Sequence, residues 1–459
     1  MSVPNAGGAC ALLLDMGTGK SACVVAITGR LFLDGRIKRV LIVAPSSVCA
    51  VWPSEYERFA GFEYRVGVLL GDREKRLKEL ERLQRPATLG RGEPLRVAVV
   101  NYESSWRLED ELKAYNADMI ICDESQRIKS HTAAQSKALH RLSDRAAHRM
   151  ILTGTPMQQD VRDIWSQYRF LEPRLFGPSY YAFQQRFCVL GGYGNHQYLG
   201  ARNMDELMRK MHSVALRVKK SECLDLPEKS FEERPVPLEP SAMELYRRIQ
   251  KESFAELASG GEITANNVLT KLLRLQQISG GFIWDDDGKM LPVSDAKLDA
   301  ASEIIQTLCV DEGRKLVIFC RFTAEFNALC ERARDILGEK LRLVAIRGGV
   351  ASEQRGELVA QFQNDQNTRV FIGNIDACAE GITLTAADTM LYYSVNWNLA
   401  KYQQSQDRIH RIGQGNRCTY IHLTAPGTVD TKIMAALARK EDLAKCVVDN
   451  WRDLFGGGT

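Results

Sequence analysis

The sequence has no Cys-x-x-Cys pair, no long apolar run and no marked excess of charge of one sign. Its 12 cysteines are scattered, and even the nearest two, Cys320 and Cys330, are too far apart for a zinc-binding pair. The spacing therefore argues against a zinc cluster and favours the reduced thiols of a cytosolic protein. No apolar run approaches the roughly 18 residues of a membrane span, and no basic segment precedes the short apolar run at the N-terminus. We expect a soluble, intracellular protein without membrane contact.

The charge balance leaves the choice of partner open. A net charge of +4 neither demands nor excludes a polyanion, so any basic surface must be local. The length of 459 residues exceeds what one core usually holds. An apolar content of 45% is sufficient for large packed cores, and two or more domains are expected.

Short apolar runs that end in polar residues or glycine alternate with helical patterns. Such runs are typical of strands buried on both faces of a parallel sheet. They occupy residues 40–45, 95–101, 118–124 and 150–155, and they recur at residues 315–320, 341–349, 368–374, 389–394 and 418–423. The pattern predicts an α/β fold with two lobes, each a parallel sheet with helices on both faces.

Between the two strand-rich parts the pattern becomes helical, from about residue 161 to residue 292. A Pro- and Glu-rich stretch within it predicts a linker between the lobes. Acidic residues 284–289 predict a surface turn, and the apolar spacing from Val429 to Trp451 predicts a packing helix. The expected organisation is lobe 1 at 1–160, its helical insertion at 161–223, the linker at 224–240, a helical insertion of lobe 2 at 241–295, and lobe 2 with a C-terminal helix at 296–459.

The segment LLLDMGTGKS, residues 12–21, combines a strand with a glycine-rich turn and a helix start. Gly17 and Gly19 would let backbone N–H groups point at a phosphate, Lys20 would reach its outer oxygens, and the Ser21 hydroxyl could hold Mg²⁺. Leu14 stands where the GxxxxGK[ST] pattern has its first glycine. Taken alone, the segment could also be a structural strand-to-helix turn.

Two further turns follow predicted strands. In IICDESQ, Asp123 could hold Mg²⁺ and Glu124 could position an attacking water, although such a pair is also a common helix cap. In LTGTPMQQD, the hydroxyls of Thr153 and Thr155 could sense phosphates, although the segment is by itself an ordinary Gly-Pro turn. Their position on the same sheet as Lys20 favours the catalytic interpretation.

Residues 403–414 read QQSQDRIHRIGQ, with two arginines close together. On a helix, Gln404, Arg408 and Arg411 would project from one face, because they are spaced i, i+4, i+7. His410 is expected to be a packing or interface residue rather than an acid-base catalyst. A solvated basic helix face is the alternative.

In their order along the chain, these motifs resemble those of the SWI/SNF-type DNA translocase ATPases of helicase superfamily two, as a single motor core of bacterial or phage-like size. The resemblance covers nearly the whole chain and is specific as an ordered set. The segments that carry it are DMGTGKS, DESQ, LTGTPMQ, GITLTAAD and QDRIHRIGQ, with APSSVCAVWPSEYERF, NYE, RVKKSECLDLPEK and GGVASEQRGELVAQF as supporting matches.

The resemblance implies two RecA-like lobes, helical insertions, and ATP with Mg²⁺ bound between the lobes. Arg408 and Arg411 would face the phosphates held by Lys20, with Gln404 at the lobe interface, and Glu124 would complete the catalytic set. An arginine finger contributes roughly 10³–10⁵ in rate. Nucleotide binding is assigned to Met16, Gly17, Thr18, Gly19, Lys20, Ser21 and Gly381, metal binding to Ser21 and Asp123, and coupling to Gln126, Thr153 and Thr155.

The same resemblance implies a track for double-stranded DNA that is gripped mainly by its backbone. The expected contacts lie in turns after strands, and each could instead be a loop residue with no ligand. They are Pro45, Ser46, Asn101, Tyr102, Arg321 and Thr383.

The implied function is an ATP-dependent, DNA-stimulated translocase that remodels protein–DNA complexes or DNA structures. A strand-separating DNA or RNA helicase is the first alternative, and a non-hydrolysing nucleotide-dependent binding protein is the second. The expected location is the bacterial or phage-infected cytosol or nucleoid, or the nucleus in a eukaryote. A protein partner could supply targeting, and the sequence leaves the pathway and the oligomeric state open.

The chain departs from the family pattern in two places that bear on coupling. Ser125 and Gln126 stand where Ala and His are more common, and residues 374–381 diverge from the usual motif. Coupling between the lobes could differ in strength at these positions. A glutamine-containing segment that reads adenine is also not found upstream of residue 12.

Overall fold

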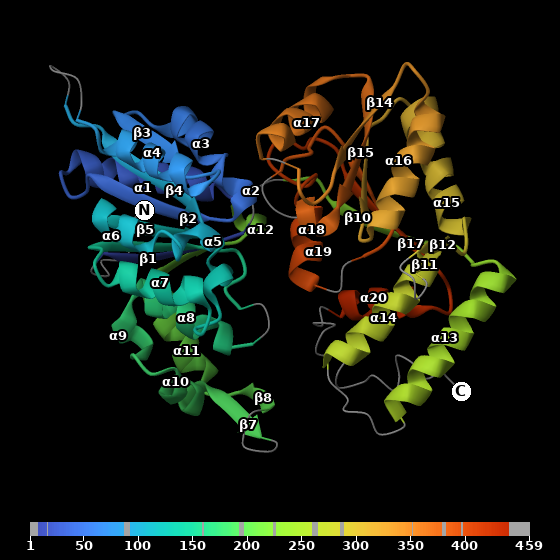
Figure 1. Cartoon of the computed structure of the whole chain (residues 1–459), viewed down its shortest axis with the longest axis horizontal. Helices are drawn as coiled ribbons and strands as arrows, with labels where there is room; N and C mark the ends of the chain where they lie inside the picture. Colours follow the sequence, from blue (N-terminus) through green and yellow to red (C-terminus); the bar gives the residue numbers. More distant parts are fainter. Residues whose placement is uncertain are drawn as a thin grey trace. The chain divides into compact units, whose positions relative to one another are not determined.

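Two parallel sheets organise the chain, one in each of two units (Figure 1). Unit 1 comprises Met1–Asp225 and unit 2 comprises Leu226–Thr459. The computed structural model describes residues 8–15, 17–86, 92–157, 160–191, 197–223, 226–258, 265–284, 289–350, 352–378, 382–395 and 398–439. In this part of the chain, no helix is both long and apolar enough to cross a membrane.

The sheet of unit 1 has seven strands in the order β3-β4-β2-β5-β6-β1-β9, all parallel. Five of them are nearly continuous buried apolar runs, as parallel strands covered on both faces should be. The strands are β1 (Ala9–Leu14), β2 (Arg39–Ala44), β3 (Tyr64–Val68), β4 (Leu95–Asn101), β5 (Met119–Asp123), β6 (His148–Leu152) and β9 (Ala215–Val218).

Helices cover both faces of this sheet. Successive residues of β1 point to opposite sides: Leu13 packs in a core with helix α8, whereas Leu12 packs in a second core with Val24 and Val25 of α1. The helices are α1 (Lys20–Leu33), α2 (Ser46–Cys49), α3 (Trp52–Phe59), α4 (Arg73–Gln84), α5 (Tyr102–Ser105), α6 (Glu109–Tyr115), the 3₁₀ helix η1 (Ser125–Ile128), α7 (Ala134–Ser143) and α8 (Arg162–Leu171).

The insertion expected at 161–223 is only partly helical. After α8 it contains α9 (Pro173–Phe176), α10 (Tyr180–Phe187), α11 (Met204–Ser213) and α12 (Lys220–Cys223), but also a hairpin of β7 (Cys188–Gly191) and β8 (Gln197–Ala201). Strand β9 then returns to the main sheet beside β1. The prediction of helix was wrong for these strands, because they are short and not fully buried and so carry no continuous apolar run.

The sheet of unit 2 has six parallel strands in the order β10-β17-β16-β13-β15-β14. Its strands are β10 (Lys229–Pro235), β13 (Leu316–Cys320), β14 (Arg342–Ile346), β15 (Thr368–Asn374), β16 (Thr389–Tyr392) and β17 (Cys418–Thr424). Its helices are α13 (Pro240–Ala258), α14 (Ala265–Ser279), α15 (Ala296–Ile305), the π-helix η3 (Gln306–Asp311), α16 (Thr323–Leu337), α17 (Ser352–Asn364), α18 (Ile375–Cys378), α19 (Leu399–Gln406) and α20 (Val429–Ala438). The expected α/β class with two parallel sheets is therefore confirmed.

The stretch expected to be a linker, 224–240, contains strand β10. This strand pairs with β17 along its whole length, from Lys229 opposite Cys418 to Pro235 opposite Thr424. It lies at the edge of the sheet, and all of its residues are exposed or half-buried. Charged residues and proline are typical of edge strands, which is why the sequence KSFEERP resembles a linker.

Two other expectations fall partly outside the described residues. The acidic turn lies between β11 (Phe282–Trp284) and β12 (Met290–Pro292), which pair as an antiparallel hairpin, but residues 285–288 are not described. The expected C-terminal helix is present as α20, with Val429, Ile433 and Leu437 buried. Residues 440–459 are not described.

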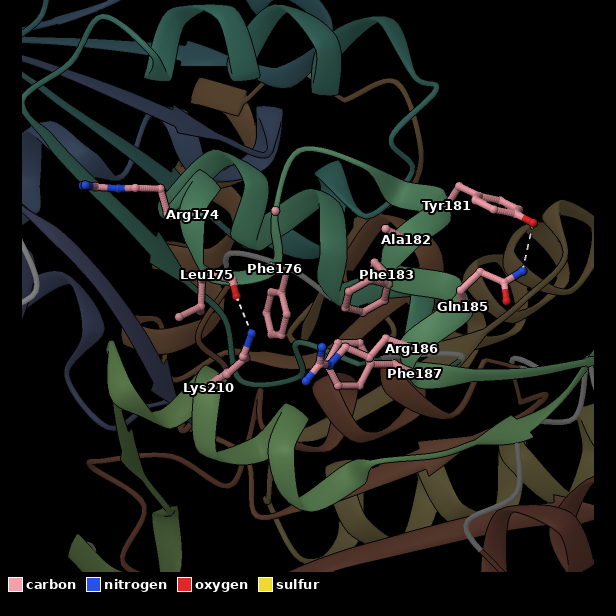
Figure 2. Close-up of a pocket in the computed structure, with 11 residues that line it drawn as sticks. Arg174, Leu175, Phe176, Tyr181, Ala182, Phe183, Gln185, Arg186, Phe187 and Lys210 are labelled. Atoms are coloured by element: carbon pink, nitrogen blue, oxygen red, sulfur yellow. Dashed lines mark hydrogen bonds between the residues drawn. The ribbon is translucent and has the colours of Figure 1, made fainter.

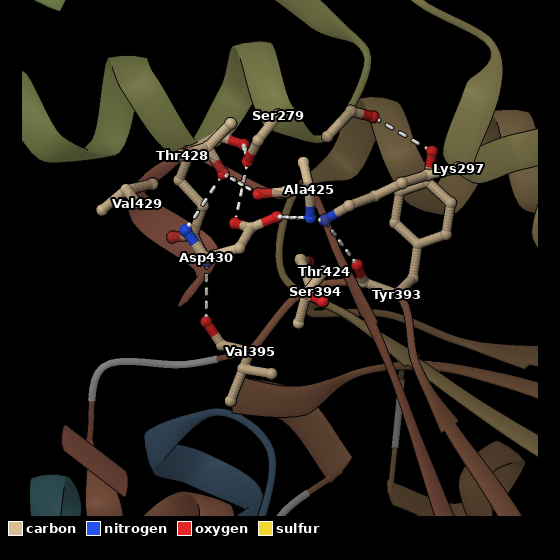
Figure 3. A network of polar contacts seen from close by, with 12 residues as sticks. Ser279, Lys297, Tyr393, Ser394, Val395, Thr424, Ala425, Thr428, Val429 and Asp430 are labelled. Atoms are coloured by element: carbon tan, nitrogen blue, oxygen red, sulfur yellow. Dashed lines mark hydrogen bonds and ion pairs between the residues drawn. The ribbon is translucent and has the colours of Figure 1, made fainter. Parts of the chain in front are cut away.

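A buried polar network joins three helices of unit 2 (Figure 3). The ammonium of Lys297 on α15 lies 2.5 Å from a carboxylate oxygen of Asp430 on α20. Asp430 also accepts hydrogen bonds from Ser279 of α14 and from the backbone N–H of Ala425. The pair is buried but satisfied on several sides, so it fixes these helices against one another.

Candidate functional site

The loop after β1 has a backbone that only glycine adopts at low cost. Gly17 and Gly19 have φ angles of 81° and 88°, in the left-handed region. A Cβ added at Gly19 would meet nothing within 4 Å, so the loop is open on that side. Thr18 closes the loop internally, because its hydroxyl donates to the Asp15 carbonyl at 2.7 Å. Met16 lies outside the described residues.

Lys20 begins helix α1 directly after this loop. Its ammonium nitrogen is buried and has no hydrogen-bond partner among the described residues, and it lies 3.6 Å from an oxygen of Glu124. Among the described residues, no side chain caps the N-terminus of α1, so its leading N–H groups, including that of Ser21, can act as donors. A buried cation beside free amide donors at a helix N-terminus fits a phosphate group.

The acidic pair, Asp123 and Glu124, lies at the end of strand β5. The loop after β6 begins at the same edge of the sheet, because β5 and β6 are parallel neighbours. Asp123 and Glu124 are both buried, with 8% and 7% exposure. Glu124 has a φ angle of 53°, which is rare for a residue with a side chain and costs energy unless the surroundings impose it. In the described residues there is no cluster of three or more His, Cys, Asp or Glu side chains that could hold a metal by itself. Asp123 and Ser21, predicted from the sequence to hold Mg²⁺, carry oxygen donors of the kind that this ion prefers.

A chain of hydrogen bonds connects the acidic pair to the loop after β6. The amide nitrogen of Gln126 donates to Glu124 at 2.7 Å, and its amide oxygen accepts from the Thr153 hydroxyl at 2.8 Å. The Thr153 hydroxyl in turn accepts from the backbone N–H of Thr155 at 3.0 Å. The Thr155 hydroxyl is buried without a partner among the described residues. Gln126, Thr153 and Thr155, predicted as coupling residues, are thus in one network.

The expected DNA contacts in unit 1 lie at the ends of β2 and β4, on the same sheet edge as the glycine-containing loop after β1. Ser46 is exposed and Pro45 is buried. Asn101 is half-buried, and its side chain accepts from the Ser104 N–H and so caps α5. Of these three side chains, Ser46 and part of Asn101 present polar atoms to solvent.

Tyr102 is not available as a DNA contact through its side chain. The ring is fully buried, and its hydroxyl donates to the Asp123 carbonyl at 2.8 Å. Burial raises the pKa of this phenol well above its ordinary value. The prediction that Tyr102 contacts DNA is therefore corrected. The side chain instead supports the acidic pair by holding the Asp123 carbonyl.

The arginine motif of unit 2 does not form the continuous helix that we expected. Helix α19 ends at Gln406, and the N–H of Arg408 bonds to Ser405, three residues back instead of four. Arg408 and Arg411 thus lie beyond the end of α19, but their guanidinium groups still donate to the neighbouring residues Ile382 and Thr383. Gln404 itself is 8% exposed.

The two arginines have different environments. Arg408 is only 1% exposed, and its guanidinium donates to the carbonyls of Gln404 and Ile382 at 3.0 Å each. Arg411 is half-buried and donates to the Thr383 hydroxyl at 2.9 Å. Arg408 therefore holds the backbone in place, and Arg411 is the arginine of this motif that reaches solvent.

Other residues around this motif serve packing. His410 is buried and lies 2.8 Å from the Pro227 carbonyl, in agreement with a packing role. Thr383, expected at the DNA track, is bound to Arg411. Gly381 lies outside the described residues.

Arg321, expected at the DNA track, is tied to helix α14. Its guanidinium donates to the amide oxygen of Gln276 at 2.7 Å. Burial lowers its pKa to about 10, so it is still a cation at neutral pH. It follows β13 at the sheet edge and is half-buried.

Gln167, which contacts the loops after β5 and β6, was not identified from the sequence, and Ser125 was noted only as a departure from the family pattern. Ser125 and Gln167 are fully buried and hydrogen-bonded to each other at 2.7 Å. A glutamine on the apolar face of an amphipathic helix such as α8 is the signal that could have identified Gln167.

A separate cavity of about 650 Å³ lies in the insertion of unit 1 (Figure 2). The three rings of Phe176, Phe183 and Phe187 lie together beside it. Two of its cations are already engaged: Arg186 pairs with Glu206, and Lys210 donates to the Leu175 carbonyl. None of the residues predicted for nucleotide or DNA lines it.

Two family models match this chain. The SNF2-related domain matches residues 4–280, and the helicase conserved C-terminal domain matches residues 296–413. The first match alone covers more than half of the chain. The two matches fall on either side of a short gap at 281–295.

Relatives align over most of the chain. The DNA annealing helicase and endonuclease ZRANB3 of Mus musculus is 29% identical over 94% of this chain and 38% of its own length. The putative ATP-dependent helicase/translocase YwqA of Bacillus subtilis is 28% identical over 97% of this chain and 47% of its own length. The chain thus spans less than half the length of these two relatives. The solved SWI2/SNF2 ATPase core of Sulfolobus solfataricus in complex with dsDNA gives a TM-score of 0.42 at 26% identity, over 99% of this chain and 94% of that chain.

Proposed function

Because the chain belongs to the SNF2-related family, we propose that it is an ATP-driven translocase that moves along duplex DNA and remodels protein–DNA complexes or DNA structures. The observation that carries this proposal is the buried Lys20 ammonium, which has no hydrogen-bond partner among the described residues and lies 3.6 Å from Glu124. Lys20 is thus ion-paired with Glu124, but its buried N–H donors make no hydrogen bond among the described residues, which is costly, and a nucleotide phosphate would accept them.

In this proposal Lys20 and the N-terminal amides of α1 bind the phosphates. Ser21 and Asp123 hold Mg²⁺, which neutralises phosphate charge when bound. Glu124 orients the attacking water and accepts its proton. The hydrogen bond from Gln126 leaves Glu124 in one orientation, because the Gln126 amide is itself fixed by Thr153.

Arg411 is proposed to supply the positive charge that the transferred phosphoryl group needs as its charge develops. The support is that Arg411 is half-buried and donates to a hydroxyl, whereas Arg408 is buried and committed to two carbonyls. Arg411 is therefore partly accessible to an anion, whereas Arg408 is not.

DNA as the partner is supported by the name of one relative, a DNA annealing helicase, and we propose that the DNA is a duplex. The exposed Ser46 and the half-buried Asn101 follow β2 and β4 on the same edge as the phosphate loop. Contacts from such turns would be to the sugar-phosphate backbone, so binding should fall steeply with salt and depend little on base sequence.

The test compares ATP hydrolysis with duplex DNA, single-stranded DNA and RNA. We expect duplex DNA to stimulate the rate most, because a translocase on duplex DNA should bind it best in the conformation that hydrolyses ATP. Displacement of a triplex-forming strand without separation of a forked duplex supports translocation. Efficient separation of the fork, or stimulation by RNA alone, would instead favour a strand-separating helicase. Absence of phosphate release under all conditions would favour a non-hydrolysing binding protein.

A further inference from the structure

Gln167 on helix α8 connects the two loops that follow β5 and β6. Its amide oxygen accepts from the Ser125 hydroxyl at 2.7 Å. Its amide nitrogen donates to the carbonyls of Pro156 and Asp163 at 2.7 and 2.8 Å. The side chain has no exposed surface, and both of its N–H groups have acceptors.

We propose that Gln167 is a positioning residue that sets the geometry of Glu124 relative to the threonine loop, acting through Ser125 and Pro156. It touches neither nucleotide nor metal in this role. The inference rests on the proposed function, since it assigns a role in the same hydrolytic site.

Two separate routes now join the same two loops. The first runs from Glu124 through Gln126 to Thr153. The second runs from Ser125 through Gln167 to Pro156. A single attachment leaves one loop free to rotate relative to the other, whereas attachment at two points fixes both distance and rotation.

The backbone at Glu124 explains why a second attachment matters. The left-handed φ of 53° at this residue persists only if its surroundings hold it. Ser125 is the next residue, and its hydroxyl is held by Gln167. An ion pair of 3.6 Å between Lys129 and Asp163 also ties the end of this loop to α8. Helix α8 therefore holds Glu124 through Ser125 and Lys129, which follow Glu124 in the chain.

The competing interpretation is that Gln167 merely satisfies buried polar groups of the core. In that case its loss would lower the stability of unit 1 and leave the turnover of the folded enzyme unchanged. The two interpretations therefore differ in the rate constant kcat of folded protein and in whether the effects of Ser125 and Gln167 are independent.

The experiment uses the full chain with Ser125→Ala, Gln167→Met and the double variant. Met is close to Gln in length and can fill the same space without hydrogen bonds. For Gln167→Met we expect kcat of DNA-stimulated ATP hydrolysis to fall about tenfold, with the nucleotide Kd within about twofold of wild type. The double variant should match Gln167→Met alone, because both changes cut one route. Gln185→Leu, on the exposed surface of α10, is the control and should retain wild-type kcat.

Each outcome has a defined meaning. Folded single variants with wild-type kcat, or effects on kcat that simply add, would overturn the role of Gln167. If Gln167→Met does not fold, Ser125→Ala decides alone, because it removes only one hydroxyl; a fall of about threefold or more supports the role. Wild-type protein that hydrolyses no ATP, with or without DNA, would overturn the proposed function and this role with it.

Discussion

The two units hold their candidate catalytic side chains in opposite ways. In unit 1, Glu124, Gln126 and Thr153 are bound to one another, so the position of each depends on the next. In unit 2, Arg408 and Arg411 are bound to different partners, and only Arg408 is fully buried. A change within the unit 1 network should therefore spread to its neighbours, whereas the two arginines should be separable by mutation.

The largest effect is expected for the loss of Arg411, the residue that best tests the difference between the two units. Arg411→Ala removes a cation that matters most when charge develops on phosphate, so turnover should fall by about 10³–10⁵ with folding and nucleotide binding retained. The measurement is DNA-stimulated phosphate release together with nucleotide binding. Arg417→Ala, which removes an exposed arginine nearby, is the matched control. Wild-type turnover in Arg411→Ala would show that this motif plays no part in hydrolysis.

Glu124→Gln tests the unit 1 network at its functional end. The amide can still accept the hydrogen bond from Gln126 but cannot take a proton, so hydrolysis should fall by about 10²–10⁴ while nucleotide still binds. Lys20→Ala should instead weaken nucleotide binding. Arg30→Ala, at an exposed position of the same helix α1, serves as the control for Lys20. Normal turnover by Glu124→Gln would remove it from the catalytic set.

Arg408→Ala should show that the role of Arg408 differs from that of Arg411. The change leaves the Gln404 and Ile382 carbonyls without this donor and opens space in the core of unit 2, so the free energy of unfolding should fall by about 2–4 kcal/mol. Denaturant unfolding of Arg408→Ala and Arg411→Ala side by side is the measurement. Equal stability of both variants with equal loss of turnover would contradict the division of labour.

The smallest effect is a pH dependence in unit 2. Burial raises the pKa of Glu325 from 4.5 to about 7, and the hydrogen bond from Ser394 opposes this change. Because the folded state binds the proton more tightly, Glu325 contributes stability that is complete below pH about 4.5 and is lost as the pH rises through about 7. Each tenfold gain in proton affinity on folding corresponds to about 1.4 kcal/mol.

Glu325→Gln should remove that part of the pH dependence, because its amide does not titrate but can still accept from the N–H groups of Arg321 and Phe322. Unfolding curves between pH 5 and 8 would show it as a flatter profile than that of wild type. Glu331→Gln on the same helix α16, whose side chain is exposed, should leave the profile unchanged. An unaltered slope in Glu325→Gln would mean that another group titrates.

The buried strands and the order of the motifs were predictable because they are local in sequence. A strand such as β13 is apolar throughout, and the polar Arg321 follows it directly. The edge strand β10 carries charge because only one neighbour covers it, so its sequence does not differ from that of a linker. The role of Arg408 depends on where α19 stops, and the partners of Tyr102 and Gln167 lie in distant segments. Sequence spacing contains none of these long-range contacts.

The position of β1 in its sheet has a consequence for synthesis of the chain. Its two neighbours are β6, with Ala9 opposite Arg149, and β9, with Ala11 opposite Ala215. During translation, the apolar β1 leaves the ribosome well before either partner, and closing such long loops slows folding. Strand β1 therefore has no partner until β6 has emerged, and one of its edges stays open to aggregation until β9 follows.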